Sequence, residues 1–401
     1  MGRDVLPILI AGGGLGGLAA ALGLARKGRT CIVLEQAPRL GEIGAGIQLA
    51  PNAFHAFDAL GIGEEARRGA VFVEELVLMD AVTGERITVI PVGEAFRARF
   101  GNPYAVVHRA DLHGALLQAC RASARVDLRV NARVESYEQD AGGVSAILSS
   151  GQRIRGCALV GADGLRSNVR KQVVGDGEPI VSGHTTFRSV IPTERMPADL
   201  RWNAAVLWAG PKCHLVHYPL KGGKAFNLVV TAHNDAREAV VGKPVAKEDV
   251  HKTFTRICPR ARQIIEHGED WKLWVLCDRE PVGTWVDGRV VLLGDAAHPM
   301  LQYFAQGACM ALEDAVCLSS TLDHCGDDPN RAFAAYNRLR APRTGRVQMS
   351  SRLIGEYIYH PSDAKAEVRN AVLRANSAQD YYDGLEWLYG RAGLGGVATT
   401  L

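Results

Sequence analysis

The stretch that decides the fold is RVVLLGDAAHPMLQYFAQGACMALED, residues Arg289 to Asp314. It opens with an apolar run, Val290 to Leu293, that does not alternate with polar residues, as expected of a strand covered on both faces. Gly294 and Asp295 end the run, and an amphipathic helix is predicted to begin near Gly307. A strand, an acid at its carboxyl end and a helix N-terminus make a site for a polar cofactor, although an ordinary strand–helix turn has the same pattern.

The N-terminal sequence favours the cofactor site. An apolar run leads into a turn in which Gly12, Gly14 and Gly17 have the G-x-G-x-x-G spacing. Gly12 allows the tight turn, Gly14 lets a pyrophosphate approach the backbone, and Gly17 lets the next helix pack on the strand. A second predicted strand ends in Glu35, whose carboxylate would accept hydrogen bonds from a ribose diol and repel the 2′-phosphate of NADP. We therefore predict a bound dinucleotide.

Length and composition place the chain among globular enzymes with two domains or one elaborated domain. It has 401 residues and a formal net charge of +3, which gives no reason to expect binding to nucleic acid or to an anionic membrane. Its nine cysteines form no CxxC pair, so we predict no metal or dithiol site, and dispersed thiols in an odd number indicate the cytoplasm. No apolar run is long enough to span a bilayer.

The order of predicted elements indicates an α/β (mixed α+β) fold. We expect a Rossmann-like, discontinuous cofactor-binding domain, an inserted β-sheet substrate domain and a C-terminal helical region. The assigned ranges are 1–70, 98–180 and 270–330 for the first, 71–97 and 181–269 for the second, and 331–401 for the third. Smaller predictions are a β-meander that starts at Val126, a helix over 247–266, and Asp111 as a helix N-cap.

Two further segments are candidates for ligand contact. The glycine-rich segment Gly41 to Asn52 follows the second strand, so its backbone is expected to pass close to a flat ligand, or else to form a flexible loop. Residues 182–232 alternate as antiparallel strands, which we predict to form the substrate sheet. His214, Val216 and Tyr218 share one face of an extended strand. They line a cavity in one interpretation and are half-exposed strand residues in the other.

Three motifs now stand in one order: GGGLGG with Glu35, GADGLRSNVR after Val160, and GDAAHPM with AQGACMALED. Together they resemble the single-component, FAD-dependent aromatic hydroxylases, the p-hydroxybenzoate hydroxylase-like group of flavoprotein monooxygenases. The resemblance implies FAD, with Gly12, Gly14, Gly17 and Glu35 on its ADP half. It also implies a further set of cofactor-binding residues: Gln48, Arg109, Asp163, Asp295, Gly307 and Ala308.

Gln302 is an informative departure, because the group commonly has proline there. An amide can hydrogen-bond a ring hydroxyl or a carboxylate, which proline cannot. With His214 and Tyr218, this residue makes the chain resemble the 3-hydroxybenzoate 6-hydroxylases, which produce 2,5-dihydroxybenzoate (gentisate). We predict His214, Tyr218 and Gln302 as catalytic residues that also bind substrate. Gln48 and Tyr104 are further substrate-binding candidates by position only.

The resemblance also implies a reaction. NADH reduces FAD, O2 adds to give a flavin C4a-hydroperoxide, and this species attacks the ring carbon para to the hydroxyl. A phenolate reacts far faster than a phenol, so His214 is expected to bond or remove the phenolic proton, because imidazole titrates near neutral pH. His298 is assigned a structural role. NADPH in place of NADH stays open, and a homodimer is expected because relatives are often dimers.

Other functions stay open at this point. Within the same class of enzyme they are a salicylate hydroxylase and a 6-hydroxynicotinate 3-monooxygenase. More remotely, a flavin reductase or electron carrier without oxygen transfer would share the FAD motifs, but it would not need His214, Tyr218 and Gln302 to meet in one cavity.

Overall fold

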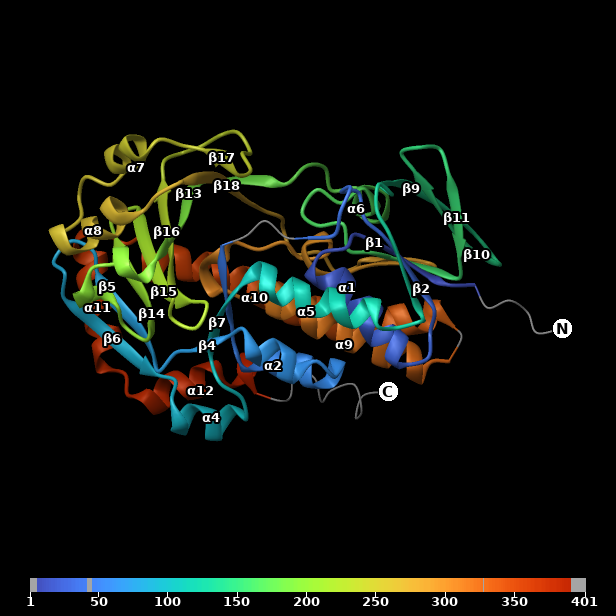
Figure 1. The fold of residues 1–401 in the computed structure, drawn as a ribbon, viewed down its shortest axis with the longest axis horizontal. Helices are drawn as coiled ribbons and strands as arrows, with labels where there is room; N and C mark the ends of the chain where they lie inside the picture. The colour runs from blue at the N-terminus through green and yellow to red at the C-terminus, as the bar shows by residue number, and fades with distance from the viewer. Residues whose placement is uncertain (1–5, 42–44, 327, 391–401) are drawn as a thin grey trace.

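The computed structural model describes residues 6–41, 45–326 and 328–390. The ends of the first and last predicted domains, and residues 42–44 of the glycine-rich segment, lie outside the described residues. Figure 1 shows an elongated molecule with one large sheet toward each end. The sheet with β1 and β2 lies on the right of this view, and the sheet with β13 to β16 lies on the left.

The first sheet holds the N-terminal glycine turn. Its order is β19-β20-β12-β1-β2-β8, and every pairing except β19 with β20 is parallel. The strands are β1 (Ile8–Ala11), β2 (Cys31–Leu34), β8 (Val126–Arg129), β12 (Ala158–Gly161), β19 (Val286–Asp287) and β20 (Val290–Leu292). The helices packed with it include α1 (Leu15–Arg26), α5 (Arg109–Arg121) and α9 (Gly307–His324). β1, β12 and β20 are buried at every position, which explains their unbroken apolar runs.

The predicted meander is wrong in its first strand. β8 pairs in parallel with β2, from Cys31 beside Val126 to Leu34 beside Arg129, because helix α5 first carries the chain back along the sheet. The antiparallel three-stranded sheet consists of β9 (Val134–Asp140), β10 (Gly143–Leu148) and β11 (Arg153–Gly156). Asp111 is also not an N-cap, since α5 begins at Arg109 and His108 holds that position.

The second sheet has eight strands in the order β17-β18-β13-β16-β15-β14-β5-β6. They are β5 (Glu75–Asp80), β6 (Arg86–Pro91), β13 (Ile180–Pro192), β14 (Ala204–Gly210), β15 (Cys213–Leu220), β16 (Ala225–His233), β17 (Lys243–Pro244) and β18 (Lys272–Asp278). Only β14 and β5 pair in parallel. β18 extends the sheet beyond residue 269, the boundary that the sequence suggested.

Residues 247–266 form two helices, not one. They are α7 (Lys247–Thr253) and α8 (Pro259–His267). Pro259 starts α8, and proline disfavours helical backbone at the residue before it. In the break between the helices, the Cys258 N–H donates to the carbonyl of Ala81 over 2.7 Å, which ties the segment to the end of β5.

Smaller elements lie between the strands of these sheets. They are β3 (Gly46–Leu49), β4 (Val71–Phe72), β7 (Ala105–His108), α2 (Pro51–Leu60), α3 (Gly63–Arg68), α4 (Glu94–Phe100), α6 (Asn168–Val173) and the short turns η1 (Thr193–Arg195), η2 (Ala198–Leu200), η3 (Gly294–Ala296) and η4 (Gln302–Phe304). β3, β7 and β4 form a three-stranded sheet of their own. The cofactor-side loops thereby reach the eight-stranded sheet without a long linker.

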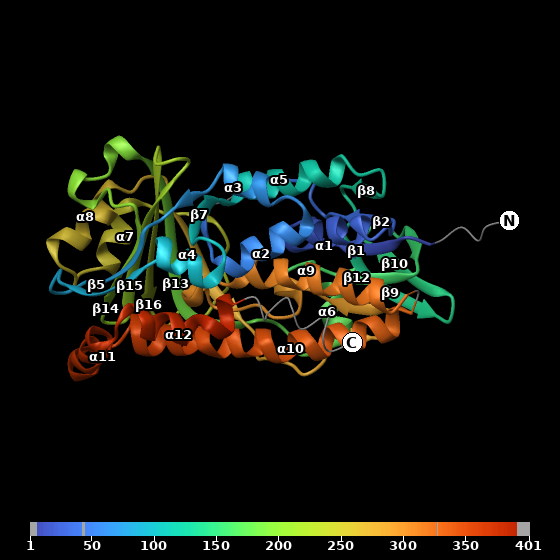
Figure 2. The ribbon, with the colours of Figure 1, turned by 90° about the horizontal axis from the view of Figure 1, so that it is seen from below.

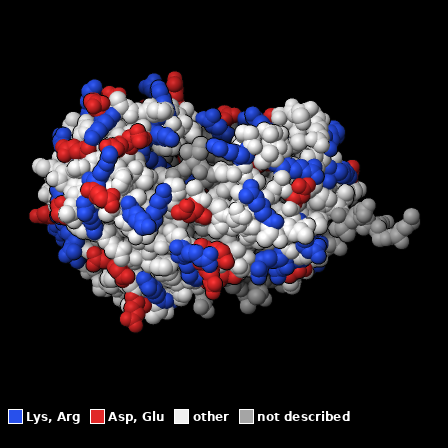
Figure 3. All heavy atoms as spheres, in the orientation of Figure 1, with Lys and Arg blue, Asp and Glu red and all other residues white. Residues whose placement is uncertain are grey.

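The C-terminal part of the chain is helical: α10 (Pro329–Ile354), the π-helical turn η5 (Gly355–Tyr359), α11 (Asp363–Ala375) and α12 (Ala378–Tyr389). Figure 2 shows these elements along one side of the molecule, with α10 toward the first sheet and α11 beneath the second. Within the described ranges, no helix has both the length and the apolarity needed to cross a membrane. On the face shown in Figure 3, basic and acidic side chains are interspersed.

Candidate active site

A cavity of about 650 Å³ lies between the two sheets, next to the turn that follows β1. The glycine turn, the η3 loop, the start of α9 and one face of the eight-stranded sheet line it. Most predicted site residues are among the lining residues: Gly14, Gln48, Tyr104, Arg109, His214, Tyr218, Asp295, Gln302, Gly307 and Ala308. Gly12, Gly17, Glu35 and Asp163 are not among the lining residues.

The glycine turn is packed too tightly for side chains. A Cβ at Gly12, where φ is +104°, would lie 2.3 Å from the carbonyl oxygen of Ala162, and one at Gly17 would lie 2.0 Å from that of Gly12. Glu35 supports the turn, because its carboxylate accepts hydrogen bonds from the N–H groups of Gly13 (2.7 Å) and Ala37 (2.8 Å). A carboxylate has further lone pairs, which suit the hydroxyls of a ribose.

Asp163 stabilises a helix. Its carboxylate accepts hydrogen bonds from the Ser167 hydroxyl (2.5 Å) and from the N–H groups of Asn168 (2.9 Å) and Val169 (3.3 Å) at the start of α6. Burial raises the pKa of this carboxyl, and these hydrogen bonds oppose that effect. Asp163 therefore fixes the loop whose next residue, Gly164, lines the cavity.

The N-terminus of α9 presents donors to the cavity. Gln306 occupies the N-cap position but makes no side-chain cap. The first N–H groups of the helix, at Gly307 and Ala308, therefore have no partner within the helix and carry a partial positive charge. The Gln306 Oε1 accepts from Asn52 Nδ2 over 2.9 Å, whereas its Nε2 is buried and has no partner among the described residues. These groups fit the carbonyl edge of an isoalloxazine ring.

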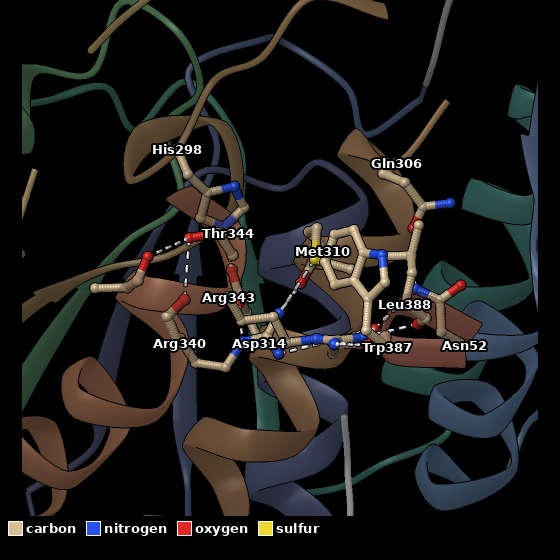
Figure 4. A network of polar contacts seen from close by, with 12 residues as sticks. Asn52, His298, Gln306, Met310, Asp314, Arg340, Arg343, Thr344, Trp387 and Leu388 are labelled. Atoms are coloured by element: carbon tan, nitrogen blue, oxygen red, sulfur yellow. Dashed lines mark hydrogen bonds and ion pairs between the residues drawn. The ribbon is translucent and has the colours of Figure 1, made fainter. Parts of the chain in front are cut away.

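A buried ionic network holds α9 and the η3 loop in place (Figure 4). Arg340 of α10 bonds to both Glu313 and Asp314, each over 2.6 Å. Asp314 also accepts from the Gly294 N–H (3.0 Å) and from His298 (2.5 Å). Burial alone would raise the pKa of Asp314, but His298 and Arg340 outweigh it and leave the pKa at about 2. His298 is therefore part of the hydrogen-bond network that supports the η3 loop, as expected of a structural residue.

The sheet face toward the cavity is organised by strand register. His214 of β15 pairs with Thr231 of β16, which in turn pairs with Thr186 of β13. Two residues further along the same strands, Val216 pairs with Val229, which in turn pairs with Arg188. Because alternate residues of a strand share a face, His214, Val216 and Tyr218 all line the cavity.

Tyr218 and Tyr104 lie on the side of the cavity formed by β3. A Cβ at Gly46 would come within 2.6 Å of the Tyr218 ring, so this backbone can approach the ring only as glycine. The Tyr104 hydroxyl donates to Gln48 Oε1 over 2.7 Å. Burial raises the pKa of Tyr218, so its phenol stays protonated and can donate to a ligand.

Gln302 lines the cavity, and the amide that the sequence assigned to the substrate has partners within the protein. Its Oε1 accepts from an Arg188 guanidinium N–H over 2.7 Å, and its Nε2 donates to the hydroxyls of Thr186 and Thr231, each over 3.1 Å. Both amide protons are therefore used within the protein. The structure makes Gln302 a support for Arg188.

Arg188 is the site residue that sequence reasoning missed. It lines the cavity, and no carboxylate of the described residues forms an ion pair with it. Its Nε is buried without a partner, and burial lowers the pKa of its guanidinium below the usual value. The alternation in TTFRSVIPT does place Arg188 on the same strand face as Thr186, so a cation on a predicted substrate strand was the available signal.

His214 has a second histidine as its partner. Its Nδ1 lies 2.8 Å from Nε2 of His360, the residue after η5. Burial lowers the pKa of His214 well below its ordinary value, and the neighbouring charges of His360 and His184 add to this effect. The sequence led us to expect an imidazole that titrates near neutral pH, and enclosure of the His214 side chain moves its pKa below that range. No sequence pattern marked His360.

Comparison with known proteins agrees with this geometry. Residues 5–351 match the family described as FAD binding domain. The chain is 56% identical to 3-hydroxybenzoate 6-hydroxylase 1 of Aquipseudomonas alcaligenes over 96% of this chain and 97% of the relative. It is 48% identical to the 3-hydroxybenzoate 6-hydroxylase of Klebsiella oxytoca, with 96% and 97% covered. The fold is shared with Klebsiella pneumoniae HpxO complexed with FAD and uric acid, at a TM-score of 0.84, 24% identity, and 96% and 97% coverage.

Proposed function

The chain belongs to the FAD-binding-domain family of single-component, flavin-dependent aromatic hydroxylases, and from that premise we propose that it converts 3-hydroxybenzoate to 2,5-dihydroxybenzoate with NADH and O2. One observation carries the proposal. The cavity beside the α9 N-terminus is lined by Arg188, a cation with no acidic partner among the described residues, and by His214, a histidine whose lowered pKa keeps it neutral. A hydroxybenzoate carries the two matching groups, a carboxylate and a phenolic hydroxyl.

The residues on the first sheet suit FAD. The glycine turn and Glu35 would hold the ADP half, and Asp295, Gln306 and the start of α9 would hold the flavin end. When bound, the flavin takes a hydride from NADH and activates O2 for transfer of one oxygen atom to the ring. The positive end of the α9 dipole favours the electron-rich, reduced form. We accordingly assign the cofactor to the first sheet and the aromatic substrate to the second.

Arg188 would anchor the substrate carboxylate. A half-buried guanidinium without an acidic partner is costly unless an anion joins it, and a guanidinium fork fits a carboxylate through two hydrogen bonds. Gln302 and the two threonines fix where the guanidinium points. The anion would thus be held at one end of the cavity before the ring is hydroxylated.

His214 would handle the phenolic proton. Its Nδ1 is bonded to His360, so Nε2 is the nitrogen that remains for the substrate hydroxyl. A neutral imidazole accepts a hydrogen bond or a proton, and removing that proton raises the electron density of the ring at the position para to the oxygen. Apolar neighbours such as Val216 and Leu207 line the same cavity and keep water from the reacting atoms.

The test is an assay of the purified holoenzyme. NADH oxidation and O2 consumption are followed with 3-hydroxybenzoate, salicylate and 6-hydroxynicotinate, and the products are separated by chromatography. We expect 3-hydroxybenzoate to stimulate NADH oxidation and to yield 2,5-dihydroxybenzoate in proportion to the NADH consumed. Catechol from salicylate, a hydroxylated pyridine, or NADH oxidation that no phenol stimulates would each refute this substrate assignment.

The setting of the enzyme is also a proposal. We infer that it works in the cytoplasm, where NADH is supplied, and the nine cysteines, all free thiols, support a reducing environment. A homodimer is expected, and light scattering at several protein concentrations measures the mass directly. Steady-state kinetics with NADH and NADPH determine which nicotinamide is preferred.

A further inference from the structure

We propose that His113 of α5 is a positioning residue of the cofactor site. Its side chain holds the glycine turn so that the N–H group of Gly14 faces the pyrophosphate of FAD. His113 belongs to none of the three motifs and does not line the cavity. The proposal concerns the cofactor that the family binds, so it goes beyond the proposed substrate and does not depend on it.

His113 is a polar residue on an apolar face of α5. The buried residues Leu116, Leu117 and Cys120 follow it at helical spacing and therefore share its face of the helix. His113 is 2% exposed, and a buried polar group is costly unless it is hydrogen-bonded. Its Nε2 lies 2.9 Å from the carbonyl oxygen of Gly13. Because a carbonyl oxygen can only accept, Nε2 carries the proton and donates it to the glycine turn.

The same glycine is fixed on its other side by Glu35. The Gly13 N–H donates to a Glu35 carboxylate oxygen over 2.7 Å, while the Gly13 carbonyl accepts from His113. Both peptide groups that flank Gly13 therefore have a set direction. These bonds matter because glycines, which lack a Cβ, leave a peptide group free to turn over. A side chain at position 13 could not restrict it instead, since its Cβ would lie 2.3 Å from the side chain of Leu40.

The direction of the Gly13 carbonyl determines where the next N–H group points. In a trans peptide the C=O bond and the following N–H bond point in nearly opposite directions, and the described residues contain no cis peptide bond. Since the Gly13 carbonyl points toward His113, the Gly14 N–H points away from it. Gly14 lines the cavity, whereas Gly13 and His113 do not. This places the Gly14 N–H on the cavity side of the turn.

The Gly14 N–H is an open donor. It has no hydrogen-bond partner among the described residues. Gly14 is the N-cap of α1, a helix with no acidic residue in its first turn, so the unpaired N–H groups at this end keep their partial positive charge. Such a helix start binds phosphate, and FAD contains a pyrophosphate. If the peptide group turned over, it would present a carbonyl oxygen to these negative charges. His113 therefore keeps a donor, and not an acceptor, at this place.

The first measurement is the affinity of the protein for FAD, obtained from the fluorescence of the FAD that the holoenzyme releases on dilution. His113→Leu fills a similar space without a donor, so the dissociation constant of FAD is expected to rise by about 10-fold or more. His113→Gln offers an amide N–H in place of the ring N–H and is expected to stay within about threefold of the wild type. His113→Asn carries the same amide on a shorter side chain that does not reach Gly13, and it is expected to be as weak as His113→Leu.

Cys120→Ala is the matched control, because it weakens the contact between α5 and α1 away from the turn. Cys120 lies about two helical turns beyond His113, and its thiol donates to the carbonyl of Leu18 in α1 over 3.3 Å. The variant is expected to lower the midpoint of thermal unfolding, as His113→Leu does, and to keep the FAD affinity of the wild type. Comparison of the two variants separates lost packing from lost direction at the turn.

Phosphorus NMR of the holoenzyme gives a readout that a merely structural role would not change. The phosphates of bound FAD give separate resonances, whose positions depend on the hydrogen bonds that each phosphate accepts. We expect at least one resonance to shift in His113→Leu and in His113→Asn. Both are expected to keep their wild-type positions in His113→Gln and in Cys120→Ala.

Each result decides for or against the proposal. Wild-type FAD affinity in both His113→Leu and His113→Asn overturns it. Equal losses in His113→Asn and His113→Gln also overturn it, because a donor would then not suffice. A loss in Cys120→Ala as large as in His113→Leu does the same, because packing of α5 would then explain the effect. If His113→Leu does not fold, the comparison of His113→Asn with His113→Gln decides alone. A wild type that does not hydroxylate 3-hydroxybenzoate overturns the proposed function and leaves this proposal standing.

Discussion

The Arg188 guanidinium donates a hydrogen bond of 2.7 Å to Oε1 of Gln302. The Gln302 Nε2 donates hydrogen bonds to the hydroxyls of Thr186 and Thr231, so neither of its N–H groups is left for a ligand. A glutamine from the η4 loop therefore aims an arginine of β13 into the cavity. Specificity for a benzoate would follow from the cation, and the glutamine would determine where that cation lies.

Replacing Gln302 by glutamate is expected to weaken substrate binding strongly. The new carboxylate would sit within ion-pair distance of Arg188 and neutralise it in place of the substrate anion. A hydrogen bond to a charged group contributes about 1.5–3 kcal/mol, so the dissociation constant of 3-hydroxybenzoate is expected to rise by about 10- to 150-fold. Flavin absorbance changes on titration measure it. Unchanged affinity would show that Arg188 does not bind the carboxylate.

Replacing Arg188 by methionine is expected to discriminate between charged and neutral ligands. The variant keeps the bulk of the side chain and removes the charge, so the affinity for 3-hydroxybenzoate is expected to fall by about 100-fold, in line with the loss of a charge-assisted bidentate contact. Binding of 3-hydroxybenzamide, which has no charge, is expected to change much less. Equal losses for the two ligands would assign Arg188 to the cofactor or to packing.

Glu35→Gln is expected to weaken FAD binding without affecting the substrate face. The carboxylate accepts from two backbone N–H groups, of Gly13 and Ala37, and an amide would place an NH2 group against one of these donors. We expect the affinity of the apoprotein for FAD to fall by about 10-fold or more. Quenching of FAD fluorescence on titration measures this affinity. A variant that holds FAD as tightly as the wild type would contradict the assignment of Glu35.

Asp314 is expected to make the free energy of unfolding depend on pH in the acidic range. Its folded pKa, about 2, lies below the ordinary value of 3.8, so its contribution is complete well above that ordinary value and is lost as the pH falls through it toward 2. At about 1.4 kcal/mol per pKa unit, this is a contribution of roughly 2 kcal/mol.

Chemical denaturation of wild type and Asp314→Asn at several pH values measures the effect. At neutral pH the variant is expected to lose about 3–5 kcal/mol, because Arg340 is left buried beside one acid instead of two. Its stability should also fall less steeply between pH 4 and 2 than that of the wild type. Parallel curves for the two proteins would show that other groups control the acid response.

Sequence and structure agree best where the chemistry is local. The turn at Gly12, the acid after β2 and the start of α9 each depend on a few neighbouring residues, so their types and spacing are sufficient to place them. Arg188 and His214 lie on different strands, and only the register through β16 brings them onto one face. His360 reaches the site through the π-helical turn after α10, which no residue pattern announces.

The same distinction explains what the sequence did not show. The resemblance placed Gln302 over the flavin, facing the substrate, but it could not show that the bonding partners of the amide come from β13 and β16. β8 was expected in a meander because it is short and close in sequence to two other strands, whereas the path of α5 decides its partner. In both cases the decisive contact is distant along the chain.

The strand order of the first sheet has a consequence for biosynthesis. β1 and the glycine turn are among the first residues synthesised, but β20 and α9, which complete the cofactor side of the cavity, come from residues 290–324. At the usual rate of translation, about 5–20 residues per second, the turn waits tens of seconds on the ribosome for its partners. The nascent chain is therefore expected to lack the cofactor side of the cavity through most of translation and to bind its cofactor only after α9 has been synthesised.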